Sequence, residues 1–186
     1  MHIVRAATEA DIPEIIRVTN RAYRAESFCI AGERTDLDDI RALCEGGRFL
    51  VIDDADCPTQ LLGSVYVKTA GARGYLGMLA VNPDAQGRGL SRLLVAAVEA
   101  HCHAAGCGFV DLTVVNLRDD LFPYYRKFGF IEGDIIAFPV PERMLQPLHL
   151  VQMSKAIASS AMDEVPAQSR AICQNAPDGD HGNTAE

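Results

Sequence analysis

The sequence predicts a three-layer domain of the α/β or α+β class, in which a mixed sheet carries helices on both faces. Short apolar segments with strand character alternate along the chain with amphipathic segments at helical spacing, and this alternation favours such an architecture. The chain has 186 residues, of which 48% are hydrophobic and 23% are charged. This size and composition suit one globular domain with a sizeable core.

Six apolar segments are predicted to be strands. They cover 49–52, 61–68, 75–81, 109–115, 135–138 and 148–154. The first two are separated by the turn-rich segment 53–58, so we expect them to form a hairpin.

Three amphipathic segments are predicted to be helices. Thr8 and Asp11 have the spacing of a capping box, and an apolar face then continues from 12 to 23. A second short helix is expected over 36–43, with two glycines ending it at 46 and 47. A third begins at Leu90. Its residues at helical spacing are expected to face the sheet, and they are Leu90, Leu93, Leu94, Ala97, Val98 and His101.

The turn between the strand at 75–81 and the helix at Leu90 is the most informative segment. It contains Gly87 and Gly89 with Arg88 between them. The first amides of a helix have no intrahelical partner and carry partial positive charge. The two glycines lack the Cβ atoms that would keep a phosphate away from these amides. The segment therefore predicts an anion site, and a pyrophosphate suits it well.

Three glycine-rich templates compete for this turn. A P-loop requires Lys and then Ser or Thr after its last glycine, whereas Leu90 and Ser91 stand here, which disfavours a nucleoside triphosphate. A dinucleotide-binding turn requires a third glycine where Arg92 stands. That alternative stays open, with Asp111 as the partner of the ribose. The third template is the acyl-CoA turn of the GNAT acetyltransferase superfamily, and Gln86–Ser91 resembles it closely.

The resemblance to the GNAT superfamily extends beyond the turn. The strand 109–115 is followed by Asn116, and Tyr125 then stands shortly before the pair Gly129 and Phe130, in the order and at the spacing typical of that superfamily.

Two end segments complete the likeness. The segments 3–8 and 148–155 look like the opening and closing strands of the superfamily, so the resemblance covers about residues 1–157. It implies a mixed, largely antiparallel central sheet with helices on both faces.

The resemblance implies an N-acetyltransferase. Such an enzyme transfers an acetyl group from acetyl-CoA, used as a co-substrate without a metal, to a primary amine of a small molecule or a peptide by direct attack in a ternary complex. Two alternatives stay open, namely a catalytically inactive protein that binds or senses CoA and a dinucleotide-binding oxidoreductase.

The same resemblance implies which residues bind the cofactor. The backbone of the strand before the turn is expected to bind the pantetheine, the turn to bind the pyrophosphate, and an asparagine to contact the pantetheine arm. These residues are Leu79, Ala80, Val81, Gln86, Gly87, Arg88, Gly89, Leu90, Ser91 and Asn116.

Tyr125 is the implied catalytic residue, a general acid for the departing thiolate. A phenol with a pKa of about 10 gives its proton to a thiolate of pKa about 8.5 only uphill, so positioned hydrogen bonding is part of this role. Of the two adjacent tyrosines, we expect Tyr124 to be the core residue. The link between Asn116 and this pair is about two residues longer than in the superfamily, and Pro123 lies inside the expected helix.

The general base and the acceptor are not identified by the sequence. Many members of the superfamily carry a Glu on the strand before the turn, and residues 75–78 supply none. Candidates that could act through water are Glu26, Glu33, Asp53 and His149, and none is assigned. By resemblance, the acceptor pocket is expected at 23–35 and 138–148.

Charge and hydropathy limit the classes of binding partner that the sequence predicts. The net charge of −8 argues against nucleic acid, and no apolar run is long enough to cross a bilayer. The N-terminus lacks a signal pattern, so a cytoplasmic protein is expected. A homodimer is compatible with the sequence, which does not decide the oligomeric state.

Two further features are expected to carry no chemistry. The six cysteines are scattered without a Cys-x-x-Cys spacing, and His101 and His103 point to different faces of a helix, so no metal site is expected. Residues 158–186 form an acidic C-terminal tail without apolar periodicity, which we expect to be disordered or loosely attached.

Overall fold

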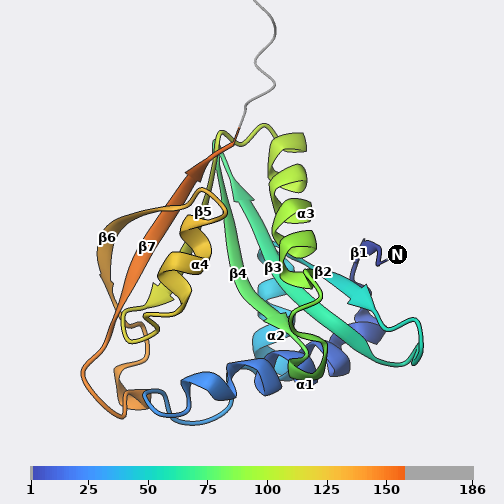
Figure 1. The fold of residues 1–186 in the computed structure, drawn as a ribbon, viewed down its shortest axis with the longest axis horizontal. Helices are drawn as coiled ribbons and strands as arrows, with labels where there is room; N and C mark the ends of the chain where they lie inside the picture. Colours follow the sequence, from blue (N-terminus) through green and yellow to red (C-terminus); the bar gives the residue numbers. More distant parts are fainter. Residues whose placement is uncertain (1, 158–186) are drawn as a thin grey trace, which may run out of the picture.

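A seven-stranded sheet forms the centre of the computed structural model, which describes residues 2–157 (Figure 1). The strand order is β1-β2-β3-β4-β5-β7-β6, and every neighbouring pair is antiparallel except β4 and β5, which are parallel. The predicted mixed, largely antiparallel sheet is therefore confirmed. The strands are β1 (Val4–Ala6), β2 (Arg48–Asp53), β3 (Leu61–Ala70), β4 (Arg73–Val81), β5 (Phe109–Val115), β6 (Ile131–Ala137) and β7 (His149–Ala156).

Helices cover both faces of this sheet (Figure 1). In β2, Phe49 and Val51 pack in one core cluster with residues of α1 and α2, whereas Leu50 and Ile52 pack in another with residues of α3 and α4. This division follows from the two-residue period of a strand, which sends successive side chains to opposite faces. The helices are α1 (Ile12–Tyr23), α2 (Leu37–Gly46), α3 (Leu90–Ala104) and α4 (Leu121–Arg126).

Four short 3-10 turns connect these elements. They are η1 (Glu9–Asp11), η2 (Arg24–Glu26), η3 (Pro83–Ala85) and η4 (Pro141–Arg143).

The start of α1 is fixed by the predicted pair Thr8 and Asp11. The Asp11 carboxylate accepts hydrogen bonds from the backbone N–H of Thr8 at 2.7 Å and from its hydroxyl at 2.9 Å. Arg5 of β1 donates to the same carboxylate at 2.8 Å and also to Asp53 of β2. Local capping and a pair of ion contacts thus hold the first helix against the edge of the sheet.

The prediction of which α3 residues are buried was wrong along one edge of the helix. Leu93 was expected to face the sheet, yet 39% of its surface is exposed, whereas Val95 and Cys102 are buried. The buried row runs at four-residue steps from Leu90 to Cys102, with Val95 beside it, and Leu93 falls on the opposite flank. Cys102 comes so close to β4 that a Cβ atom at Gly74 would lie 2.2 Å from its sulfur.

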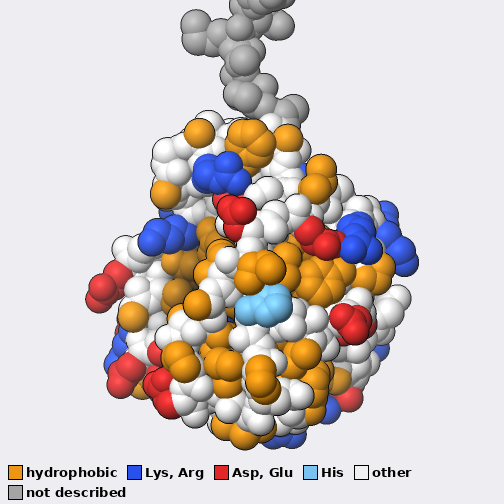
Figure 2. Space-filling model, turned by 90° about the vertical axis from the view of Figure 1, so that its left-hand side faces the viewer, with side chains coloured by type: hydrophobic (Ala, Val, Ile, Leu, Met, Phe, Trp, Pro, Cys, Tyr) orange, Lys and Arg blue, Asp and Glu red, His pale blue; other side chains and the backbone are white. Residues whose placement is uncertain are grey.

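The strand β6 begins earlier than the predicted range 135–138. It covers Ile131–Ala137 and forms an edge of the sheet with every residue exposed, including Ile131 and Ile135. A strand exposed on both faces has no alternation of apolar and polar residues, so its first half gave no periodic signal. Figure 2 shows the side of the molecule where β6 and β7 lie, with hydrophobic side chains scattered over it.

The strands β4 and β5 separate after the first three residues of each, and this separation positions the site. They pair only from Arg73 and Phe109 to Tyr75 and Asp111. Beyond that point β5 stays with β7, while β4 stays with β3 through a bulge opposite Ser64 to Tyr66. Met78, in the bulge, has a φ of 49°, an uncommon conformation for a residue with a side chain.

Among residues 2–157, no helix is both long and apolar enough to cross a bilayer. The predicted acidic tail at 158–186 lies outside the residues that the structure describes.

Candidate active site

The glycine-rich turn leads from β4 through η3 into α3. Gly87 has a φ of 81°, and Gly89, the N-cap of α3, has a φ of 74°. Both values lie in the left-handed region, which glycine adopts without a steric penalty. An added Cβ atom would meet no atom within 4 Å at either position, so the backbone conformation rather than crowding requires glycine here.

The amides of this turn are available to a ligand. The first hydrogen bonds of α3 are donated by Arg92 and Leu93 to the carbonyl of Gly89, at 3.1 and 3.3 Å. The N–H groups that precede them lie at the positive end of a 15-residue helix. The structure thus has the arrangement of an anion site that the sequence predicts.

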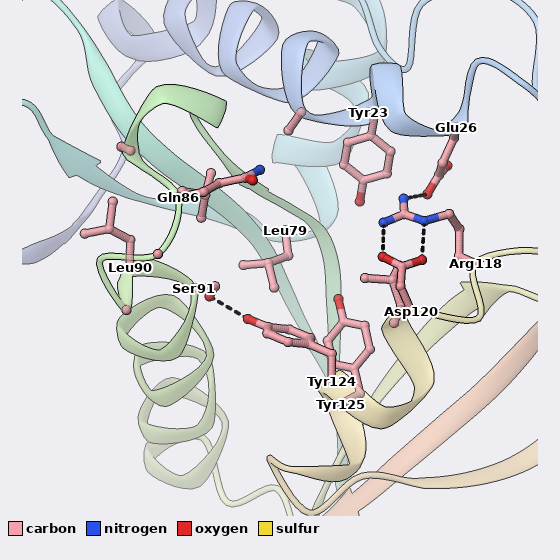
Figure 3. Close-up of a pocket in the computed structure, with 16 residues that line it drawn as sticks. Tyr23, Glu26, Leu79, Gln86, Leu90, Ser91, Arg118, Asp120, Tyr124 and Tyr125 are labelled. Atoms are coloured by element: carbon pink, nitrogen blue, oxygen red, sulfur yellow. Dashed lines mark hydrogen bonds and ion pairs between the residues drawn. The ribbon is translucent and has the colours of Figure 1, made fainter.

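A cavity of about 380 Å³ lies beside the turn, between the end of β4, the end of α1 with η2, and α4 (Figure 3). The predicted Tyr125 lines it. Seven of the ten predicted cofactor residues also line it, namely Leu79, Val81, Gln86, Gly87, Gly89, Leu90 and Ser91.

The other three predicted cofactor residues do not line this cavity. Ala80 is buried within the sheet, with 1% of its surface exposed, and Arg88 lies exposed on the turn. The side-chain oxygen of Asn116 accepts a hydrogen bond from the backbone N–H of His149 at 2.8 Å. Asn116 therefore holds the end of β5 against β7, and its position gives no support to the predicted contact with a pantetheine arm.

The prediction that Tyr124 is the core member of the tyrosine pair was wrong. Tyr125 is buried with 8% of its surface exposed, and its ring packs edge-on against Phe130. Tyr124 is half-buried, and its hydroxyl donates a hydrogen bond to Ser91 of α3 (Figure 3). On the short helix α4 the two rings point in different directions, so Tyr124 faces α3 while Tyr125 faces the core and the cavity.

Burial sets the protonation state of Tyr125. The low-dielectric surroundings raise the pKa of this phenol well above its ordinary value of about 10. Tyr125 is therefore protonated at neutral pH, as a general acid or hydrogen-bond donor must be.

Glu26 is the one candidate base of the four that reaches the cavity. It lies in η2 with 8% of its surface exposed, and burial raises the pKa of its carboxyl group although Arg118 opposes this shift. Asp53 is instead paired with Arg5 at the far edge of the sheet. Neither Glu33 nor His149 lines this cavity.

Arg118 holds Glu26 in place. Its Nη1 lies 3.3 Å from the Glu26 carboxylate, while its Nε and Nη2 donate to Asp120 at 2.9 and 2.8 Å (Figure 3). Neither Arg118 nor Asp120 was a predicted site residue. Both lie in the link after Asn116 that looked too long in sequence, and that extra length was the only signal.

A second cavity of about 200 Å³ lies where β4 and β5 have separated. Its lining includes Arg34, Phe138 and Arg143, which fall in the two segments predicted to form the acceptor pocket. Five residues line both cavities and thus form their boundary, namely Tyr23, Glu26, Leu79, Leu121 and Tyr125. Burial raises the pKa of Tyr23 to about 12, so this hydroxyl too is protonated at neutral pH.

Two further observations concern the dinucleotide alternative and the groups that could bind a metal ion. Asp111, the ribose partner in the dinucleotide alternative, is engaged within the sheet, where Arg73 donates to it at 2.6 Å. In residues 2–157 no group of three or more His, Cys, Asp or Glu side chains is placed to hold a metal ion.

Comparison with known sequences identifies the family. The family model described as the acetyltransferase (GNAT) family matches residues 13–130. A mycothiol acetyltransferase of Gordonia bronchialis is 33% identical over 141 residues, which are 73% of this chain and 46% of the relative. A mycothiol acetyltransferase of Saccharopolyspora erythraea is 30% identical over 136 residues, which are 68% of this chain and 42% of the relative. The chain thus spans about half the length of these curated relatives.

Solved structures agree in fold. The ribosomal-protein-S18-alanine N-acetyltransferase of Escherichia coli superposes with a TM-score of 0.69 at 16% identity, over 88% of this chain and 99% of that one. A nourseothricin acetyltransferase superposes with a TM-score of 0.66 at 17% identity, over 84% of this chain and 99% of that one. The family model and the solved structures agree on one class of fold. The chain belongs to the GNAT family, as its sequence motifs predicted.

Proposed function

We propose that this protein transfers the acetyl group of acetyl-CoA to a primary amine of a small molecule or a peptide, by direct attack in a ternary complex. The observation that carries this proposal is the meeting of two cavities at one boundary, which Tyr23, Glu26 and Tyr125 help to form. One cavity adjoins the anion-binding turn and suits the donor, while the other suits the acceptor. Both substrates can therefore be bound at the same time.

The donor is proposed to bind mainly through backbone groups. The amides from Gly87 to Ser91 would bind the pyrophosphate at the N-terminus of α3. Because β5 leaves β4 after Tyr75, main-chain groups of β4 on that side have no strand partner among the described residues, and they are proposed to bind the pantetheine arm. An amide near Leu79, beside the bulge, would face the thioester oxygen.

The proposed reaction balances in protons and bonds. The neutral amine attacks the thioester carbon, and the backbone amide near Leu79 stabilises the oxyanion. The new C–N bond forms and the C–S bond breaks. The nitrogen gives up a proton to Glu26 through water, and the thiolate receives one from Tyr125, which regains it through solvent. The products are the N-acetylated amine and free CoA.

The pKa direction of Glu26 agrees with its role. The raised pKa of Tyr125 makes full proton transfer to a thiolate of pKa about 8.5 more uphill, so positioned hydrogen bonding from its hydroxyl is a large part of its role. Burial keeps Tyr125 protonated at neutral pH and raises the pKa of Glu26 toward the working range of a general base. Arg118 acts as a positioning residue, since it contacts Glu26 rather than the reacting atoms.

An acyl-CoA consumption assay beside a binding measurement tests this function. Release of CoA thiol that depends on an added amine supports the transferase. The acceptor panel should include small molecules and peptides, since the neighbours in fold are named for nourseothricin and for a ribosomal-protein alanine. Affinity for CoA without thiol release with any amine would instead support the sensing alternative. Calorimetry that finds no affinity for acetyl-CoA or CoA overturns both.

Two points concern the state of the protein in the cell. The cytoplasmic location is a prediction from the sequence. A homodimer is compatible with the sequence, and light scattering coupled to size-exclusion chromatography measures the oligomeric state. The exposed edge strand β6 is the surface to mutate if a dimer is found.

A further inference from the structure

The wall of the acceptor-side cavity is built by two segments far apart in sequence. The backbone N–H of Ala31 donates to the carbonyl of Arg143 at 2.8 Å, and that of Leu145 donates to Cys29 at 2.9 Å. The Arg143 side chain reinforces this link, because its Nε donates to the carbonyl of Ala31 at 2.9 Å. The loop after η2 and the segment around η4 thus support each other.

Two arginines on this wall have no carboxylate partner among residues 2–157. Arg34 lies over the Tyr23 ring at 5.1 Å from its centroid, and it forms no ion pair in this part of the chain. Arg143 donates through Nε and Nη2 to the carbonyls of Ala31 and Glu33, which leaves its Nη1 available. Both guanidinium groups line the 200 Å³ cavity and an adjoining hollow of about 130 Å³.

The local charge is therefore the reverse of the charge of the whole chain. The acceptor-side cavity is lined by Arg34 and Arg143 against Glu26 alone, and Glu26 is already paired with Arg118. The chain as a whole carries a net charge of −8. Two guanidinium groups with free donors favour an anion at this wall, and a guanidinium matches the geometry of a carboxylate.

The cavity is small, and its remaining lining combines hydroxyl groups with apolar side chains. The hydroxyl groups belong to Tyr23, Tyr75, Thr113 and Tyr125. The apolar side chains include Ile30, Met78, Val115, Phe138, Val140 and Leu150. The cavity volume of about 200 Å³ is below the range of roughly 300–1,000 Å³ that is typical of drug-sized ligands. The occupant is therefore compact and has an apolar body.

We propose that the acceptor is a free amino acid with an apolar side chain, whose carboxylate is bound by Arg34 and Arg143. Its amine then points to the boundary between the two cavities, where Glu26 and Tyr125 lie, and its side chain contacts the apolar lining. This inference rests on the proposed acetyl transfer, and it names the class of acceptor for that same site.

Paired acceptors that differ only in the carboxylate test this proposal. Leucine is compared with 3-methylbutylamine, and phenylalanine with 2-phenylethylamine, by CoA release with acetyl-CoA present and with rates corrected for the neutral fraction of each amine. We expect kcat/KM to be at least about tenfold higher for each amino acid, a factor that equals about 1.4 kcal/mol.

Substitution of Arg34, which is exposed at the cavity, separates the role of the guanidinium from that of the fold. Arg34→Ala should lower kcat/KM for leucine far more than kcat/KM for 3-methylbutylamine and so remove most of the preference for leucine, and Arg34→Lys should keep part of this preference. Arg41→Ala is the matched control, because Arg41 is exposed on α2 and lines neither cavity.

Three outcomes overturn the proposal while leaving acetyl transfer intact. These are equal kcat/KM for leucine and 3-methylbutylamine, equal losses for both acceptors in Arg34→Ala, and a higher kcat/KM for peptides than for free amino acids. Absence of thiol release with every acceptor would overturn acetyl transfer instead. In that case the melting temperature of the CoA-bound protein is measured with and without leucine. A rise with leucine that Arg34→Ala abolishes supports the carboxylate site. No rise with leucine overturns it.

Discussion

The guanidinium of Arg118 lies 3.3 Å from the carboxylate of Glu26, a residue 92 positions earlier in the chain. This ion pair joins η2, which follows α1, to the segment that precedes α4. Both partners are nearly buried, with 16% of the Arg118 side chain and 10% of the Glu26 side chain exposed. The contact therefore fixes the distance between the two segments that carry Glu26 and Tyr125.

Loss of the Glu26 carboxylate should change the pH profile. Only the carboxylate accepts a proton, so kcat/KM of the wild type is expected to fall as pH drops through the raised pKa of Glu26. Glu26→Gln should lower kcat/KM by about 10²-fold at neutral pH and flatten this limb. Glu45→Gln on the exposed surface of α2 is the control. An unchanged limb in Glu26→Gln would exclude Glu26 as the base.

Removal of Arg118 should destabilise the fold through the charge it leaves behind. Arg118→Leu is expected to lower the free energy of unfolding at pH 7 by about 3 kcal/mol, because a buried carboxylate loses its partner. The double variant Arg118→Leu/Glu26→Gln should recover part of this loss. Urea denaturation measures both, and equal stability of the single and double variants would contradict this account.

The raised pKa of Glu26 also predicts how the cost of removing Arg118 changes with pH. Because the pKa of Glu26 is raised in the folded state, the folded protein binds this proton more tightly than the unfolded chain does. The resulting stabilisation is fully present below the unfolded pKa of about 4.3 and is lost as pH rises through the folded value. The cost of Arg118→Leu should therefore be larger at pH 7 than at pH 5.

Asp11 should behave in the opposite way. Its hydrogen bonds from Arg5, and then those from Thr8, hold the pKa of the Asp11 carboxyl well below its ordinary value. The stabilisation is present above the unfolded pKa of about 3.9 and is lost as pH falls through the folded value. Asp11→Asn is expected to cost about 1 kcal/mol at pH 7. A cost that does not shrink toward pH 2 in urea denaturation would contradict this assignment.

The parts of the fold that sequence predicted are those set by local patterns. The hairpin of β2 and β3, the capping pair Thr8 and Asp11, and the turn with Gly87 and Gly89 all depend on residues close together in the chain. Each is confirmed because hydrogen bonding and φ preferences act over a few residues. The family resemblance added the mixed, largely antiparallel pairing of the strands, which no local pattern contains.

The parts that sequence missed depend on contacts between distant segments. The position of α3 decides which tyrosine is buried, because the Tyr124 hydroxyl donates a hydrogen bond to Ser91 of α3 and Tyr125 is left to face the core. The burial of Glu26 depends on Arg118, which stands in another segment. The side-chain oxygen of Asn116 binds the backbone of β7, a contact that its position after β5 did not predict.

The glycine at the start of α3 should be required for binding CoA more than for folding. Gly89→Ala forces a Cβ atom into the left-handed region at a cost of about 1–2 kcal/mol, or shifts the turn and its amides. Gly106→Ala is the matched control, because Gly106 has a φ of 80° with nothing near its Cβ position, and it lies at the other end of α3. Calorimetry with CoA should show at least about tenfold weaker binding for Gly89→Ala alone. Equal affinity in the two variants would exclude the turn as the pyrophosphate site.

The two tyrosines of α4 should separate chemistry from binding. Tyr125→Phe keeps the buried ring against Phe130 and removes only the hydroxyl, so kcat is expected to fall by about 10²-fold with nearly unchanged affinity for acetyl-CoA. Tyr124→Phe removes the hydrogen bond to Ser91 beside the turn, so it should weaken the binding of acetyl-CoA and leave kcat nearly unchanged. Steady-state kinetics and calorimetry on both variants measure the two effects. Equal losses of kcat and affinity in Tyr125→Phe would remove its assignment as the acid, because a group that acts on the departing thiolate stabilises the transition state more than the bound substrate.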